Sequence, residues 1–373
     1  MENLYSIVID MGQFCTKVGF GSENTPRHRF YTVTGKPKYR SISLQDQQKQ
    51  IFIGNEIMDS LGLYKVSHPI EGGDIVNWDD FEAIINYIFY TLRVDPGMCK
   101  ILYTTNPFLS QESKKRLFEV FLEKFNVGGY YPVRGALLTM YSGGFDTGLI
   151  VDMGASNIRI TPIYKSYILQ HAVKALPLGG IALDSFMETK LQALGLPIDS
   201  AVQKKIVREL KEQACFTSLD YDTDIQQPER FQKEFTLPDS TAITIGSERF
   251  IIPELLFNPS LHNIESESIV EGIINVVESV DVDIRRDLFR NIFLMGGSSQ
   301  FPFFEIKLKQ ELEKELSKLG KIAHQVHIIA PKERTISNWV GGSILAMIPE
   351  FQRSWITRKK FYENGVPEDL LDA

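Results

Sequence analysis

The feature that most constrains the fold is an internal repeat in which two apolar, strand-like segments each run into Asp-Met-Gly. Residues 8–18 read VIDMGQFCTKV, and residues 150–160 read IVDMGASNIRI. In each copy a short mixed stretch leads to a cation followed by a β-branched residue, with Lys17 in the first copy and Arg159 at the matching place in the second. Copies this far apart indicate two related domains rather than a short-period solenoid.

The rest of the chain alternates short apolar runs with longer amphipathic stretches, which predicts an α/β fold. Strands are expected at Tyr5–Asp10, Ile101–Tyr103, Leu149–Asp152, Ile158–Ile163 and Asn291–Met295. Helices are expected at Asp79–Leu92, Gln111–Lys124, Ala182–Leu194, Ala201–Ala214 and Phe304–Leu319. Two polar stretches, Arg40–Gln50 and Asp220–Glu229, are expected to be loops.

A strand that ends in Asp-x-Gly and turns directly into a second strand forms a hairpin suited to anion binding. Gly12 and Gly154 allow main-chain N–H groups to come close to an anion, and Lys17 could reach a phosphate as a point charge. Asp10 and Asp152 could hold a hydrated magnesium ion, which keeps most of its waters and takes few protein ligands. Two unrelated strand turns are the alternative, because Asp and Gly occur in any tight turn.

A third element strengthens this interpretation. Leu294–Phe301 reads LMGGSSQF, an apolar run into paired glycines that either bring the backbone close to a flat ligand or form a plain turn. In series with the two hairpins it predicts three loops around a nucleotide. The helical segment IVRELKEQACF adds Arg208, Lys211 and Glu212, which could face a ribose or a base edge or could form a solvent-facing ion-pair cluster.

Composition excludes several classes of protein. The chain has 373 residues with 40 Lys and Arg against 47 Asp and Glu, a formal charge of −7 that argues against direct binding of nucleic acid. The cysteines, Cys15, Cys99 and Cys215, show no CxxC spacing and are expected to be free thiols in a reducing compartment. We find no secretory signal and no apolar run near the ~20 residues of a membrane span, so a cytoplasmic location is expected.

Together these segments resemble actin and the actin-related proteins over essentially the whole chain. The segments that carry the resemblance are IVIDMGQFCTKVGF, HPIEGGDIVNWDDFEAI, GLIVDMGASNIRITPIY, DVDIRRDLFRNIFLMGGSS, IIAPKERTISNWVGGSILA and FQRSWITRKKFYENG. The resemblance implies an actin-like ATPase-domain fold of two related domains (four subdomains) hinged around a cleft for ATP or ADP with Mg²⁺. It implies an outer domain of residues 1–139 and 336–373 and an inner domain of residues 140–335.

The resemblance also implies which residues contact the nucleotide. By motif these are Asp10, Gly12, Gln13, Lys17, Asp152, Gly154, Ala155, Arg208, Lys211, Glu212, Gly296, Gly297, Ser298 and Phe301. Asp10 and Asp152 would hold the metal through water. In actins, a serine stands near the position of Gln13, and an aspartate near that of Ala155.

Two further departures concern catalysis. Gly135 stands where actins have the glutamine that orients the attacking water (or Arg134 does, if the alignment shifts by one), and Arg159 stands where they have the assisting histidine. Because phosphoryl transfer depends on positioning the nucleophile, we expect slow hydrolysis with nucleotide binding retained. Arg159 could also hold ATP more firmly or stabilise charge in the transition state.

Assembly surfaces follow from the same resemblance. The loop 40–50 would insert into a groove of a neighbouring subunit, with Ile42 and Leu44 as apolar anchors. The groove residues would be Tyr141, Gly144, Tyr167, Leu345 and Ile348. Buried core is the alternative explanation for such an aromatic and aliphatic set. The expected partners are other actin-like subunits and actin-binding regulators.

The resemblance therefore predicts an ATP-binding cytoskeletal protein, either a filament subunit or a subunit or cap of an actin-related assembly. This chain differs from conventional actins at two places. It has Gly72 where actins carry a methylated histidine, and its C-terminal residues read PEDLLDA. A nuclear subunit of a chromatin-remodelling complex is the main alternative, although such proteins often carry large insertions. A sugar kinase would need a carboxylate base in a sugar-binding segment, and a chaperone ATPase would need a further peptide-binding domain.

Overall fold

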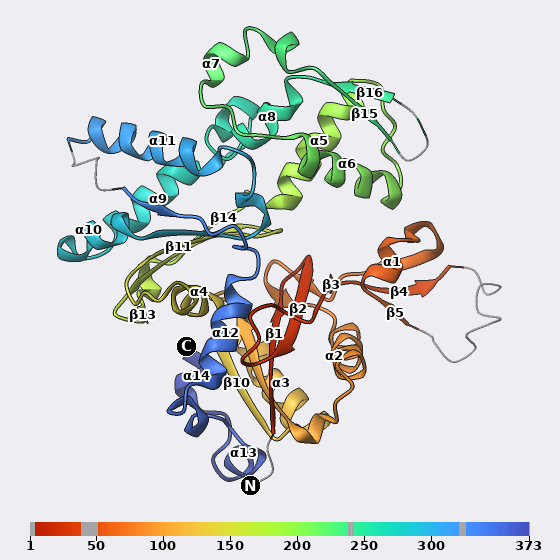
Figure 1. The fold of residues 1–373 in the computed structure, drawn as a ribbon, viewed down its shortest axis with the longest axis vertical. Helices are drawn as coiled ribbons and strands as arrows, with labels where there is room; N and C mark the ends of the chain where they lie inside the picture. Colours follow the sequence, from red (N-terminus) through yellow and green to blue (C-terminus); the bar gives the residue numbers. More distant parts are fainter. Residues whose placement is uncertain (1–3, 39–50, 238–239, 241, 321–325, 373) are drawn as a thin grey trace. The chain divides into compact units, whose positions relative to one another are not determined.

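The computed structural model of the chain describes residues 4–38, 51–237, 240, 242–320 and 326–372, which form two units (Figure 1). The first unit contains Met1–Asp146 and Thr335–Ala373, and the second contains Thr147–Arg334. Helix α4 (Gly135–Gly143) lies entirely in the first unit. The expected assembly loop, with Ile42 and Leu44, lies outside the described residues.

The sheet of the first unit has the strand order β10-β9-β1-β2-β3. Its strands are β1 (Tyr5–Met11), β2 (Cys15–Phe20), β3 (His28–Tyr31), β9 (Cys99–Thr105) and β10 (Gly129–Arg134). β1 is antiparallel to β2 and parallel to β9, which is parallel to β10. A smaller sheet contains β5 (Phe52–Ile53), β4 (Thr34–Pro37) and β6 (Tyr64–Ser67), and β7 (Ile70–Glu71) pairs with β8 (Asp74–Ile75).

The sheet of the second unit repeats that arrangement, with the order β13-β12-β11-β17-β18 and β14 paired to β12. Its strands are β11 (Gly148–Met153), β12 (Ile158–Tyr164), β13 (Tyr167–Ile168), β14 (Lys174–Leu176), β17 (Ile292–Met295) and β18 (Ile328–Ile329). β11 is antiparallel to β12 and parallel to β17, which is parallel to β18. Each unit is thus built on one Asp-Met-Gly hairpin, and the first strand of that hairpin pairs in parallel with the next strand of the sheet. A separate hairpin joins β15 (Lys233–Thr236) to β16 (Ala242–Ile245).

Strand β1 shows why these strands read as unbroken apolar runs. Ile7, Val8 and Ile9 are all fully buried. Because side chains alternate across a strand, Ile7 and Ile9 pack in one core cluster while Val8 packs in another on the opposite face, with Trp339. Because core residues cover β1 on both faces, these three positions carry no polar side chain.

The helices of the first unit are α1 (Asn55–Met58), α2 (Trp78–Leu92), α3 (Gln111–Phe118), α4, α12 (Ser337–Met347), α13 (Arg358–Asn364) and α14 (Glu368–Asp372). Helix α1 packs with the small sheet of β4, β5 and β6. The Asn77 side chain caps α2 by accepting from the N–H of Asp80, and the helix stops at Arg93 in the left-handed region. The expected helix Gln111–Lys124 is confirmed with a change of winding, since residues 119–124 continue α3 as a π-helix.

The helices of the second unit are α5 (Gly180–Ala193), α6 (Ala201–Ala214), α7 (Tyr221–Asp224), α8 (Glu248–Glu254), α9 (Ile269–Glu278), α10 (Val282–Arg290) and α11 (Phe304–Lys318). Ser200 and Gln203 form a capping box that starts α6 at the predicted residue. The expectation of an unstructured loop over Asp220–Glu229 is wrong in part. The Asp220 side chain accepts from the N–H of Thr223 and caps the single turn of α7, a local signal hidden by the polar composition.

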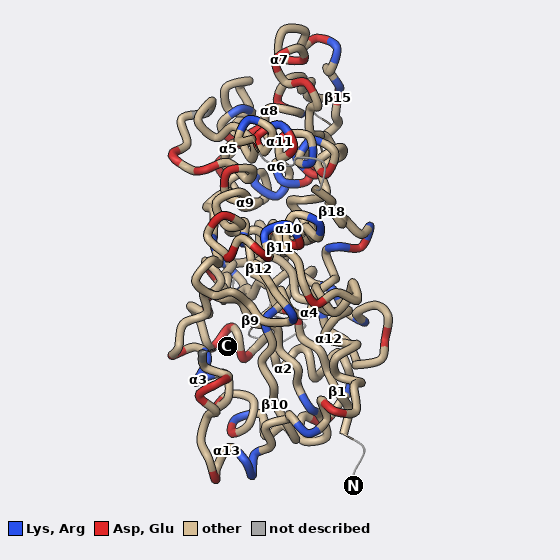
Figure 2. The backbone as a smooth tube through the Cα atoms, turned by 90° about the vertical axis from the view of Figure 1, so that its left-hand side faces the viewer, with Lys and Arg blue, Asp and Glu red and all other residues tan. Residues whose placement is uncertain are grey.

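Charged residues of both signs are interspersed along the chain in both units (Figure 2). This distribution agrees with the small net charge of the chain. Within the described part of the chain, every helix is too short or too polar to cross a bilayer.

Candidate functional site

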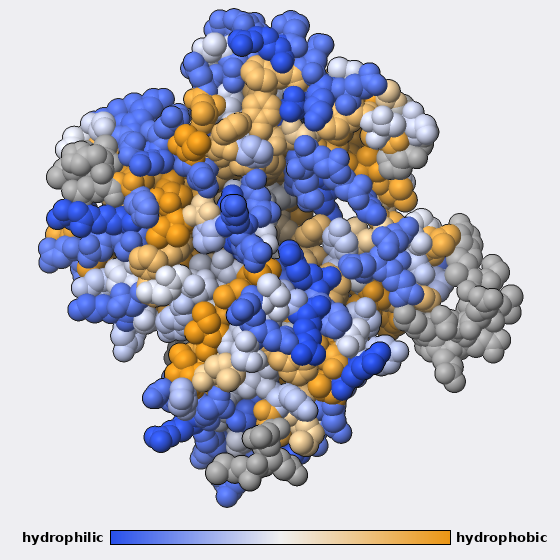
Figure 3. Space-filling model, in the orientation of Figure 1, coloured by the Kyte–Doolittle hydropathy of each residue, from blue (hydrophilic) through white to orange (hydrophobic). Residues whose placement is uncertain are grey.

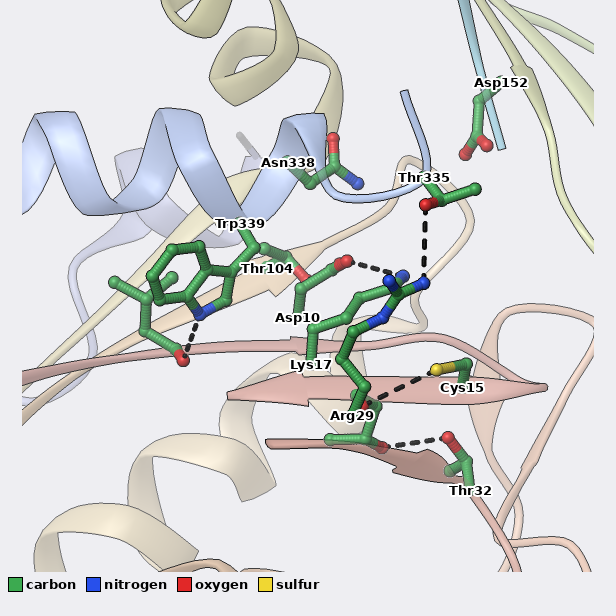
Figure 4. Close-up of polar contacts among 12 residues, drawn as sticks. Asp10, Cys15, Lys17, Arg29, Thr32, Thr104, Asp152, Thr335, Asn338 and Trp339 are labelled. Carbon is green, nitrogen blue, oxygen red and sulfur yellow. Dashed lines mark hydrogen bonds and ion pairs between the residues drawn. The ribbon is translucent and has the colours of Figure 1, made fainter. Parts of the chain in front are cut away.

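The first hairpin holds a buried carboxylate against a lysine. Asp10 and Lys17 are cross-strand partners in the register of β1 and β2, and the Lys17 ammonium lies 2.9 Å from Asp10 Oδ2. The hydroxyl of Thr104, from β9, donates to the other oxygen, Oδ1, at 2.8 Å (Figure 4). Both oxygens of this 5% exposed residue are therefore engaged. The sequence did not indicate Thr104, although its place at the end of the strand next to β1 could have done so.

The turn of this hairpin is connected to the β7–β8 turn. The N–H of Gly12 donates to the carbonyl of Cys15 at 3.1 Å, which closes the turn. The side-chain oxygen of Gln13 accepts from the backbone N–H of Gly72 at 3.2 Å. Asn106 donates from its side chain to the carbonyl of Gly73 at 2.6 Å. The Gln13 side chain thus joins the turn of the first hairpin to the β7–β8 turn at Gly72.

The second hairpin repeats the arrangement with an arginine. Asp152 and Arg159 are cross-strand partners in the register of β11 and β12, and Arg159 Nη2 lies 2.7 Å from Asp152 Oδ2. The two side chains are 18% and 19% exposed, so this carboxylate is more open to solvent than that of Asp10. Among the described residues, Asp152 Oδ1 accepts no hydrogen bond.

Three segments far apart in sequence meet at this second turn. The N–H of Gly180, in the first turn of α5, donates to the carbonyl of Gly154 at 3.0 Å, and the next N–H donates to the carbonyl of Ala155 at 2.8 Å. The hydroxyl of Ser298 donates to the Gly154 carbonyl at 3.4 Å. Gly296 has φ +86°, and a Cβ there would lie 2.3 Å from the carbonyl oxygen of Met153. Gly296 therefore allows the chain to cross close over the hairpin, whereas a Cβ at Gly297 would meet no atom within 4 Å.

The predicted cations of α6 lie together, and they share an acid that the sequence did not reveal. Lys211 contacts Asp184 Oδ1 at 2.7 Å, and Arg208 contacts Asp184 Oδ2 at 2.8 Å. Lys211 also donates to the carbonyl of Gly180 at 3.2 Å, which connects the cluster to the second turn. Burial raises the pKa of the neighbouring Glu212 carboxyl, so Glu212 keeps its proton to a higher pH than an exposed glutamate.

The remaining predicted nucleotide contacts of the second unit, Gly297 and Phe301, lie in or next to the LMGGSS loop. Gly297 lies between Gly296 and Ser298 at the start of a short 3₁₀ turn, Gly297–Ser299, and Phe301 follows that turn with 8% exposure. The second hairpin, the LMGGSS loop and the α6 cluster thus meet within the second unit. Asp10, Gly12, Gln13 and Lys17 belong to the first unit, where they lie on one hairpin.

Gly135 is the first residue of α4, and its surroundings leave no room for a side chain at this position. A Cβ at Gly135 would lie 2.7 Å from the side-chain nitrogen of Asn338 on α12. The oxygen of the same side chain accepts from the hydroxyl of Thr139 at 2.8 Å. Asn338 therefore occupies the space that a side chain at position 135 would need.

The predicted groove residues differ in exposure. Tyr141 and Leu345 are half-buried and pack against the core cluster that contains Val8 and Trp339, whereas Ile348 is exposed and follows directly after α12. Figure 3 shows apolar surface over this part of the first unit. Gly144 ends α4 with φ +73°. Tyr167, in the second unit, is 77% exposed and pairs with Tyr164 across a tight turn.

The carboxylate oxygens of the two hairpins are ligands that suit a hydrated magnesium ion. The described residues contain no cluster of three or more His, Cys, Asp or Glu side chains able to form an all-protein metal cage. Magnesium instead uses one or two carboxylates together with waters and substrate phosphates. Asp152 Oδ1 offers one such oxygen beside the turn that contains Gly154.

The comparison with protein families agrees with this geometry. The family model described as Actin matches residues 1–368 of the 373. The match covers both hairpins, the LMGGSS loop and the α6 cluster. This chain belongs to the actin family.

Proposed function

We propose that this actin-family chain binds ATP with Mg²⁺ at its two Asp-Met-Gly hairpins and serves as a subunit or cap of an actin-like assembly, with slow hydrolysis. The observation that carries the proposal is a carboxylate–cation pair built twice. Each pair lies at the same register of a hairpin that ends a central strand. Proteins of this family generally bind a nucleotide with a divalent cation, and this chain keeps the residue types that such binding requires.

The chemistry of each hairpin supports polyphosphate binding. Gly12 and Gly154 place no side chain at either turn, and their N–H groups close the turns by donating to the carbonyls of Cys15 and Asn157. Lys17 and Arg159 supply positive charge, and the arginine can bind phosphate through two parallel hydrogen bonds. When a magnesium ion is bound with the nucleotide, it supplies charge neutralisation for the phosphates through a few carboxylate contacts and its own waters.

Nucleotide binding is tested by thermal melting. At about 100 times its dissociation constant, a ligand that binds only the folded state adds ~2.7 kcal/mol to the free energy of unfolding, so ATP with Mg²⁺ should raise the melting temperature of the wild type. Asp152→Asn should weaken this binding by roughly 10- to 100-fold, as expected for a residue that orients metal-bound water. Asp222→Asn removes an exposed carboxylate of the same unit and should leave binding unchanged. A wild type that ATP with Mg²⁺ does not stabilise would refute the proposal.

The assembly part of the proposal is tested at Ile348. Because this side chain is 38% exposed, an aspartate there meets water and leaves the core intact. Loss of an interface anchor weakens the free energy of association by ~2 kcal/mol. Ile348→Asp should therefore raise the protein concentration needed for assembly roughly 30-fold, as measured by sedimentation. Its melting temperature and ATP binding should match the wild type.

Leu345→Asp is the less decisive variant, because Leu345 packs partly against the core and its loss would also lower stability. Val76→Asp is the matched control, since Val76 is a 55% exposed apolar side chain of the same unit outside the groove. Should Ile348→Asp assemble at the wild-type concentration, the contact lies elsewhere on the molecule.

A further inference from the structure

We propose that Arg159 keeps Asp152 closed to a metal ion until a polyphosphate enters, so that the nucleotide is bound first and the divalent cation second. This inference rests on the proposed function, because it assumes that the second hairpin receives the phosphates of ATP. It assigns to Arg159 a control over the order of loading at this site.

The first argument is the contact itself. Arg159 Nη2 lies 2.7 Å from Asp152 Oδ2, within the range of a charge-assisted hydrogen bond. A cation that approaches this carboxylate meets one oxygen already engaged and a positive charge beside it, and like charges repel at this distance. The pair sums to zero charge, so the hairpin alone offers a divalent cation little attraction.

The second argument is the position of the guanidinium over the turn. A Cβ built on Gly154 would lie 3.7 Å from Arg159 Nη2 and 3.9 Å from Asp152 Oδ1. The arginine therefore lies beside the glycine of the turn, whose N–H already donates to the carbonyl of Asn157, so the guanidinium is the group there that can receive an anion. A guanidinium has five N–H donors, so it can contact an arriving phosphate and then release the carboxylate. The same movement that gives the nucleotide a cation frees Asp152 for the metal.

The first hairpin shows by contrast why the control belongs to the second. Asp10 is engaged at both oxygens, by Lys17 at 2.9 Å and by the hydroxyl of Thr104 at 2.8 Å. Its side chain is 7% exposed, against 18% for Asp152. Movement of Lys17 would still leave Thr104 on Asp10, whereas movement of Arg159 leaves Asp152 with no hydrogen bond from the described residues.

The test is Arg159→Met, which removes the charge and keeps an apolar stem. Two measurements should move in opposite directions. Binding of Mn²⁺ alone, followed by its electron paramagnetic resonance signal without nucleotide, should tighten at least about tenfold, because Asp152 is no longer neutralised. Binding of ATP in excess EDTA, followed by calorimetry, should weaken at least about tenfold, because the phosphates have lost a cation. A merely structural role would weaken both.

Arg290→Met is the matched control, since it removes one exposed arginine of the same unit outside the hairpin and should change neither measurement. Asp152→Asn keeps Arg159, so it should abolish Mn²⁺ binding at this site without weakening ATP binding in EDTA. If Arg159→Met leaves both affinities unchanged, or shifts both the same way, this inference is overturned while the proposed function stands. If the wild type fails to bind ATP with Mg²⁺ at all, both proposals are overturned.

Discussion

A variant that carries Gly135→Gln, Arg159→His and Asn338→Ala should release phosphate from ATP at least ~100-fold faster than the wild type. A positioned hydrogen-bonding group that acts in the transition state contributes roughly 10²–10³ in rate, and the actin family uses a glutamine and a histidine at these two places. This chain presents neither group there. Restoring both should lower the barrier, and single-turnover phosphate release at saturating ATP with Mg²⁺ measures the change.

The third substitution follows from the structure. A Cβ at position 135 would lie 2.7 Å from the side-chain nitrogen of Asn338, so Gly135→Gln alone would force that side chain away from Thr139. Asn338→Ala by itself is the control and should leave the wild-type rate unchanged. A wild type that already matches the triple variant would show that another group orients the water, with Gln13 and Arg159 as the first candidates.

Gly341→Ala should cost at least ~3 kcal/mol of unfolding free energy, an effect near the upper end for a single methyl group. A Cβ at Gly341 would lie 1.8 Å from the backbone carbonyl oxygen of Leu138, and real Cβ atoms essentially never come within 3.0 Å of such an atom. Helices α4 and α12 would have to separate by about an ångström. Since interiors are packed as densely as crystals, the separation opens the cluster that contains Val8 and Trp339.

Chemical denaturation followed by circular dichroism measures this loss. Gly62→Ala is the control, because its Cβ would meet no atom within 4 Å, and it should change stability by no more than ~0.5 kcal/mol. If Gly341→Ala proves as stable as the wild type, α4 and α12 pack less closely than the structure shows.

The sequence predicted what depends on short-range pattern. Both Asp-Met-Gly hairpins were predicted, because a strand that runs into Asp-x-Gly and then into a second apolar run is a local signal. The pairing of each aspartate with the cation of its own hairpin was not predicted and comes from the cross-strand register. The start of α6 was also readable, because the capping box is local.

Contacts set by packing between distant elements were not readable. Asp184 joins Lys211 and Arg208 only because α5 lies beside α6, and a lone acid in a helix carries no sign of such a partner. The bond from Gly72 to Gln13 likewise depends on where a separate hairpin lies. The steric role of Asn338 at Gly135 required the crossing of two helices that are about 200 residues apart in the chain.

The division of the chain into units bears on the order in which the protein can fold during synthesis. All of the second unit, Thr147–Arg334, has been made before the last segment of the first unit exists. The indole of Trp339 donates to the carbonyl of Val8 across 331 residues of sequence, and both belong to the same core cluster. Strand β1 must therefore wait with one apolar face uncovered while a complete neighbouring unit is translated and folds. Domains generally fold as they emerge, and exposed apolar strands aggregate while they wait, so the ribosome-bound chain is most vulnerable just before Trp339 emerges.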